Sequence, residues 1–128
     1  EENLAARLVQ VGIRTMTSHQ RHQADRFGVE VVEMKDMDVV PDLKFSGEVY
    51  LTLDLDCLDP AFAPGISHHE PGGMSTRQVI SLIHGLEGNL VGADIVEFNP
   101  TRDQNGVTGM VAAKLLKEII GRMTLSYS

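Results

Sequence analysis

The stretch EVYLTLDLDCLDPAFAPG, residues 48–65, joins a nearly continuous apolar run to three aspartates and a segment rich in proline and alanine. The run over residues 48–55 contains β-branched, aromatic and leucine residues, a pattern typical of a strand covered on both faces in a parallel sheet. Asp54, Asp56 and Asp59 lie at its end and just beyond it. The stretch therefore predicts an α/β fold in which a buried strand ends in a group of carboxylates.

The other segments alternate between strand-like and helix-like patterns, which favours a mostly parallel sheet with helices packed on it. We predict strands over residues 7–13, 29–34, 48–55 and 89–96, and helices over residues 17–27, 76–86 and 106–123. Residues 36–47 suit a loop or a short helix. Residues 59–73 hold three prolines and three glycines, and a loop of this length in a compact domain is usually functional or disordered.

Composition limits the classes of protein to which the chain can belong. Its 128 residues predict one domain, residues 1–128, and its net charge of −7 argues against a nucleic-acid partner. No apolar stretch reaches about 18 residues, so we expect no membrane-spanning helix. The single cysteine excludes an internal disulfide framework and a cysteine-based zinc site.

Carboxylates follow two of the predicted strands. Asp54 and Asp56 end the first, and Asp94 and Glu97 lie at the end of the second. Ligands of parallel sheets bind at this end of the strands. Side chains two residues apart in an extended segment point the same way, so the first pair would repel unless a divalent cation lay between them. The alternative is that aspartates here only cap turns, which is the role we expect for Asp59.

Two other aspartate motifs are alternatives to the metal site. An EF-hand loop starting at Asp54 would need an oxygen ligand, a glycine and a glutamate where Leu58, Asp59 and Gly65 stand, so it is excluded. A strand-end D-x-D also opens phosphotransfer enzymes of the haloacid-dehalogenase type, with the first aspartate as nucleophile. That class needs a lysine before its acidic pair, whereas Lys114 comes later than the carboxylates here. It remains the alternative enzyme.

Two motifs in the chain resemble the arginase/agmatinase, or ureohydrolase, family. D-x-D-x-x-D-P followed by A-P-G, residues 54–65, resembles its metal-binding signature, and GADIVEFNP, residues 92–100, resembles its segment that carries a substrate-contacting glutamate. SHHEPGG at 67–73 and RFGVE at 26–30 are most similar to plant-type arginases. The resemblance covers nearly the whole chain. It implies a three-layer α/β fold with a mostly parallel sheet, of which this chain is the carboxyl-terminal portion.

The resemblance also implies roles for individual residues. Asp54 and Asp56 would bind a binuclear manganese (Mn²⁺) site, Glu97 would lie near a small cationic guanidino substrate, and Asp94 would support the site from behind. The metal-activated water would attack the guanidino carbon and release urea. The expected reaction converts L-arginine to L-ornithine and urea, and the alternative converts agmatine to putrescine and urea.

The resemblance is incomplete in one respect. The family's further metal ligands, around a GGDH and a D-x-H-x-D motif, and its catalytic histidine lie upstream of the matching segment, and neither motif occurs here. We therefore assign no catalytic residue within the chain and expect it to be inactive alone. A truncated, non-catalytic homologue remains an alternative. A homotrimer or homohexamer is implied for the complete protein, in the cytoplasm or, for a plant-like source, in mitochondria.

Residues outside the two motifs receive simpler interpretations. His68 lies in the loop after the aspartates, and because active-site loops often contact ligands we assign it to substrate binding. His84 lies in an apolar helix, SLIHGL, and is predicted to be a packed histidine. Arg102 and Asp103 are interpreted as an interface or a local ion pair, and we assign them no chemistry.

Overall fold

The computed structural model describes residues 5–125, which form two compact units divided between Asp38 and Val39. The first contains β1 (Val9–Ile13), α1 (Ser18–Phe27), β2 (Glu30–Glu33) and a turn of 3₁₀ helix, η1 (Met34–Asp36). The second contains β3 (Lys44–Asp54), the 3₁₀ turn η2 (Leu55–Cys57), α2 (Thr76–Gly85), β4 (Glu87–Val96) and α3 (Val107–Leu125). The predicted helices and strands are all present, with ends that differ by a few residues.

The first unit is a strand, helix, strand arrangement. β1 and β2 pair in parallel, with Val9 opposite Glu30. The helix between them is capped at its start by Thr17, which forms a capping box with Gln20, and at its end by Gly28, whose φ of 64° is left-handed. These two signals, both visible in the sequence, satisfy backbone groups that a helix end leaves unpaired.

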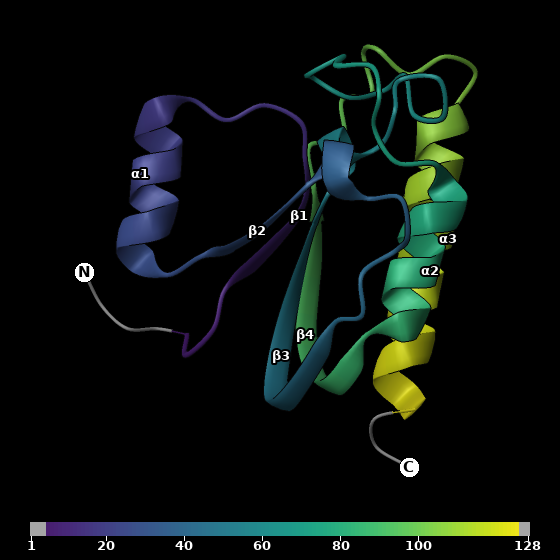
Figure 1. Ribbon diagram of the computed structural model, residues 1–128. Coiled ribbons are helices and arrows are strands. Elements are labelled where there is room, and N and C mark those ends of the chain that lie inside the picture. The colour runs from purple at the N-terminus through teal and green to yellow at the C-terminus, as the bar shows by residue number, and fades with distance from the viewer. Residues whose placement is uncertain (1–4, 126–128) are drawn as a thin grey trace. The chain divides into compact units, whose positions relative to one another are not determined.

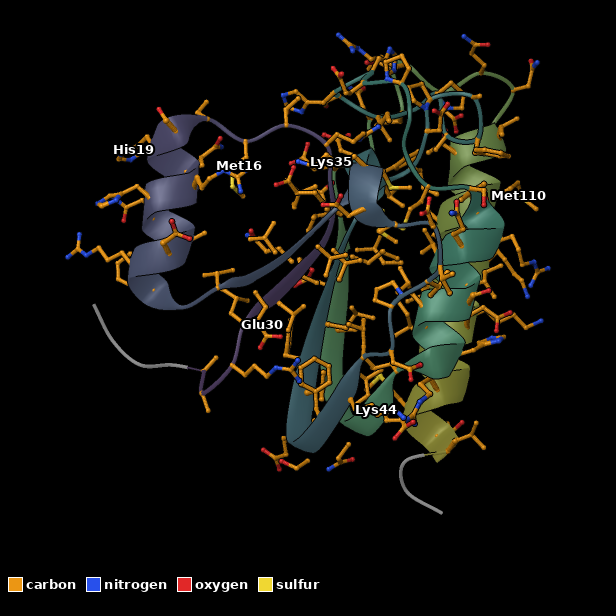
Figure 2. All side chains as sticks on the ribbon, viewed as in Figure 1. Met16, His19, Glu30, Lys35, Lys44 and Met110 are labelled. Carbon is orange, nitrogen blue, oxygen red and sulfur yellow. The ribbon has the colours of Figure 1, made fainter. Side chains whose placement is uncertain are left out.

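The second unit is built on the parallel pair of β3 and β4. Thr52 lies opposite Asp94, and Asp54 lies opposite Val96. The two strands therefore end at the same edge, where the loops that follow them gather in Figure 1. Lys44, labelled in Figure 2, lies near the other end of the pair. This register is what brings the carboxylates after each strand together.

Both helices of the second unit lie on one side of the β3–β4 pair (Figure 1). Between them they bury a continuous apolar core that includes Leu53, Leu90, Ile80, Ile83, Leu115 and Ile119. Each such side chain contributes on the order of 1.5–3 kcal/mol by leaving water.

The expectation that β3 is covered on both faces is not met within this unit, because Tyr50 on the other face is 63% exposed. No helix within residues 5–125 is both long and apolar enough to cross a membrane.

A polar cluster links α2 to α3. His84 is 58% exposed, so the prediction of a packed histidine is wrong; its Nε2 lies 2.6 Å from Glu118 Oε2. It sits at the last turn of α2, beside the acidic side chain that α3 presents. Lys114, one turn earlier on α3, also pairs with Glu118. The contacts with Lys114, which has the larger effect, and with His84 lower the pKa of Glu118 to about 2.

The lowered pKa of Glu118 predicts how acid weakens the α2–α3 contact. Because the folded-state pKa is depressed from 4.5 to about 2, the stabilisation is complete above pH 4.5 and is lost as the pH falls towards 2. The free energy of unfolding of the protein and of its Glu118→Gln variant should therefore converge over this range. Glu87→Gln, at an exposed pair with Lys44, is the control and should change stability little. Parallel pH profiles for the protein and Glu118→Gln would contradict the prediction.

Candidate metal centre

Asp56 lies at the carboxyl edge of β3, where the chain turns. Asp54 is the last residue of the strand and caps η2, its Oδ1 accepting a hydrogen bond from Asp56 N at 2.8 Å. The sequence suggested that the alternation of side chains along a strand places the two aspartates on one face. The chain instead enters a 3₁₀ turn here, so this alternation does not apply. The Asp54 residue is exposed, whereas the Asp56 side chain is 13% exposed.

The loop after η2 folds back onto the Asp56 carboxylate. Its Oδ1 accepts hydrogen bonds from Ser67 N at 3.1 Å and from His68 N at 3.4 Å. Its Oδ2 lies 2.8 Å from His68 Nδ1. The loop therefore brings the imidazole of His68 against the carboxylate.

Asp59 holds both ends of this loop. Its Oδ1 accepts from Ala61 N at 2.9 Å, and its Oδ2 accepts from Gly72 N at 2.7 Å and from Gly73 N at 3.2 Å. The expected turn-forming role of Asp59 is confirmed. The prolines and glycines of the loop thus belong to an ordered, hydrogen-bonded structure.

Glu97, directly after β4, completes a group of potential metal ligands. Its φ of 64° is left-handed, a conformation that costs a non-glycine residue about 1–2 kcal/mol. Donor atoms of Asp56, His68 and Glu97 lie within 4.8 Å of one another. Two carboxylates and an imidazole so close together suit a divalent cation such as Mn²⁺, which relieves the repulsion between the acids. In the part of the chain that the structure describes, Asp54 is not a member of this group.

Asp94 lies one strand away, on the exposed face of the β3–β4 pair. Its Oδ2 accepts a hydrogen bond from the Tyr50 hydroxyl at 3.1 Å, which raises the pKa of Tyr50. Its Oδ1 is buried and, among residues 5–125, has no hydrogen-bond partner. A buried acceptor without a donor costs about 1–3 kcal/mol. Asp94 therefore has one oxygen available to a further donor.

Sequence reasoning missed four residues that shape the site. Asn99 N donates to Gly65 O at 2.8 Å, and Arg102 Nη1 donates to Ser67 O at 2.9 Å. Thr108, in the first turn of α3, accepts a hydrogen bond from Gly65 N of the same loop, and Asp103 accepts one from Thr108 N. The signal that the sequence offered was the position of these four residues shortly after Glu97, in and beyond the NPTRD segment. Nothing in that segment identified the loop as their partner.

Comparisons with known proteins agree on one family. The model of the Arginase family matches residues 1–121. Arginase 1, mitochondrial, of Arabidopsis thaliana is 51% identical over 133 residues, which is 97% of this chain and 39% of that protein. An agmatinase of Enterobacter sp. is 39% identical and aligns with 88% of this chain and 38% of its own length. This chain therefore spans about two fifths of the relatives it matches.

A solved structure shows the same fold. It is a triple mutant of the arginase-like protein of T. brucei bound with Mn²⁺, and it is 29% identical to this chain with a TM-score of 0.90. The match covers 94% of this chain and 43% of that one. The predicted α/β fold of an arginase-like domain is thereby confirmed.

The left-handed backbone of Glu97 gives a stability prediction. The Glu97→Gly variant should have a free energy of unfolding about 1 kcal/mol higher than the Glu97→Ala variant, because glycine adopts positive φ without strain. At Thr52, in the regular part of β3 opposite Asp94, the order should be reversed, since glycine weakens an ordinary strand. Denaturant titration of the four variants measures both differences. A Glu97→Ala variant as stable as Glu97→Gly, or more stable, would show that the strain is absent.

Proposed function

Because this chain belongs to the arginase family, we propose that it forms the carboxyl-terminal part of a manganese-dependent hydrolase that releases urea from L-arginine. The observation that carries the proposal is that Asp56 and Glu97, which follow two parallel strands, lie together with His68 of the intervening loop. Identity of 51% to a plant arginase favours arginine as the substrate. Phosphotransfer through Asp54 gains no support from these matches.

In this proposal, Asp54 and Asp56 bind Mn²⁺. Carboxylate oxygens are ligands that Mn²⁺ favours, and the N–H donors of Ser67 and His68 keep the Asp56 carboxylate fixed. When bound, manganese supplies a Lewis acid that lowers the pKa of water and so provides a nucleophile near neutral pH. Asp94 would support the site from behind: within residues 5–125 its buried Oδ1 has no hydrogen-bond partner, so this oxygen could orient a neighbouring ligand.

Glu97 and His68, which lie next to the metal ligand Asp56, bind the substrate rather than Mn²⁺ in this proposal. A carboxylate can accept two parallel hydrogen bonds from a guanidinium group, which fixes both its position and its orientation. A carboxylate oxygen of Glu97 lies within 4.8 Å of one of Asp56, so the guanidino carbon would be held beside the metal. His68 is 83% exposed, which leaves its ring accessible to substrate.

The rest of the proposed enzyme lies outside this chain. The A. thaliana relative is much longer, and this chain would supply one part of a single catalytic domain. We therefore expect no urea release from residues 1–128 alone. A homotrimer or homohexamer and a mitochondrial location, the latter supported by the name of that relative, belong to the same proposal.

Agmatine is the second candidate substrate, supported by the 39% identity to an agmatinase. The two substrates share the guanidino group that Glu97 would bind and differ by one carboxylate. Urea release from each, measured with the protein in its full natural length and with Mn²⁺, separates the two activities. No urea from either would remove both and leave a non-catalytic role.

The Asp56→Ala variant tests the metal assignment. We expect at least about a hundredfold weaker Mn²⁺ binding and a comparable loss of urea release, because a ligand to the metal is removed. Isothermal titration with Mn²⁺ and a urea assay are the measurements, both on the protein in its full natural length.

Asp42→Ala is the matched control for this experiment. Asp42 is also an aspartate of the second unit but is 82% exposed and pairs with Lys44, near the start of β3. The Asp42→Ala variant should bind Mn²⁺ and release urea like the unmodified protein. If Asp56→Ala folds and binds Mn²⁺ with unchanged affinity, the assignment of Asp56 is wrong.

A further inference from the structure

The start of α3 is tied to the loop that covers Asp56. Thr108 is fully buried, and its Oγ1 accepts a hydrogen bond from Gly65 N at 2.7 Å. Its own N–H donates to Asp103 Oδ1 at 2.9 Å, and Gly109 N donates to Asp103 Oδ2 at 3.0 Å. Asp103 therefore fixes the first turn of the helix, and Thr108 uses that fixed position to hold the loop.

The contact at Gly65 leaves no room for a side chain. A Cβ placed there would lie 2.8 Å from Asp103 Cβ and 2.9 Å from Thr108 Cβ, closer than real Cβ atoms come to their neighbours. The Gly65 carbonyl is also bound, by Asn99 N at 2.8 Å. Both polar groups of the Gly65 backbone are thus held by the segment that follows Glu97.

The same segment holds the loop two residues further on. Arg102 Nη1 donates to Ser67 O at 2.9 Å, and Asn99 Nδ2 donates to Ser67 Oγ at 3.4 Å. Ser67 N is the group that donates to Asp56 Oδ1. A continuous chain of contacts therefore runs from Thr108 through the loop to the Asp56 carboxylate.

We propose that Thr108, Asp103 and Arg102 are positioning residues that hold the Gly65–His68 segment against Asp56 and so set the affinity of the site for Mn²⁺. The inference rests on the proposed function for the identity of the metal. The segment that holds the loop starts two residues after Glu97, so the contacts also fix the position of His68 relative to the substrate-binding carboxylate. These residues act through the loop, because in this proposal they touch neither metal nor substrate.

The test compares Thr108→Val, which removes the hydroxyl but keeps the shape, with Thr108→Ser, which keeps the hydroxyl. In the protein of full natural length, Thr108→Val should weaken Mn²⁺ binding about tenfold, as the loss of a group supporting a metal ligand usually does. Thr108→Ser should keep the Mn²⁺ affinity within about threefold of that of the unmodified protein. Isothermal titration gives the affinity, and the electron paramagnetic resonance spectrum of bound Mn²⁺ reports its coordination.

A second readout needs no metal. Amide hydrogen exchange at Ser67 N should become about tenfold faster in metal-free Thr108→Val, because loss of the Gly65 contact releases the donor to Asp56. Thr124→Val is the matched control: it removes a hydroxyl that bonds Gly121 O at 2.8 Å on the same helix, and it should change neither measurement.

The possible results distinguish a failure of this inference from a failure of the proposed function. If Thr108→Val lowers stability but leaves Mn²⁺ affinity, the Mn²⁺ spectrum and Ser67 exchange unchanged, the residue is only structural and the inference is overturned. Should Thr108→Val fail to fold, Arg102→Ala provides the same test from the exposed side of the loop, with weaker Mn²⁺ binding and faster Ser67 exchange expected. If the unmodified protein binds no Mn²⁺, the proposed function fails, while Ser67 exchange still decides whether the contact holds the loop.

Discussion

The parallel register of β3 and β4 is the constraint on which the rest of the second unit depends. Because Asp54 lies opposite Val96, the residues that follow each strand emerge at the same edge of the sheet. A shift of one residue in one strand would move its side chains to the other face and separate Asp56 from Glu97. Burial of Leu53 and Leu90 against the helices fixes that register, so the apolar core also determines the spacing of the carboxylates.

The three aspartates at this edge differ in the hydrogen bonds that their carboxylates accept. Asp59 is fully engaged by backbone N–H groups of its own loop, and Asp54 is engaged by the 3₁₀ turn that follows it. Asp56 is held by the loop on one side and by an imidazole on the other. These three carboxylates thus have different partners, and all three are supported by backbone donors that cost no side-chain entropy.

The sequence predicted the elements because their signals are local. Thr17, Gly28 and Ser75 are capping residues, and the apolar runs of β3 and β4 mark strands, of which one face is buried within this unit. The proximity of His68 to Asp56 followed only partly, from its place in the loop after the aspartates. The 3₁₀ turn Leu55–Cys57 was not predicted, because its hydrogen bonds, from Asp56 N to Asp54 Oδ1 and from Leu58 N to Leu55 O, correspond to no recognised pattern of residues. The environment of His84 was not predicted either, because its apolar neighbours in α2 gave no sign of Glu118, 34 residues away.

The fixed points of the loop also determine where the protein can vary. Asp59 binds the backbone at Gly72 and Gly73, and α3 holds Gly65 where no side chain fits. Between these anchors, the side chains of residues 68–70 project into solvent beside the carboxylates. His68 also contacts Asp56, and the His69 ring lies 2.8 Å from Pro64 O, so substitutions in this short tract change both what lines the mouth of the site and how its loop is held. Residues 68–70 therefore couple the surface that a ligand would meet to the folding of the loop that carries it.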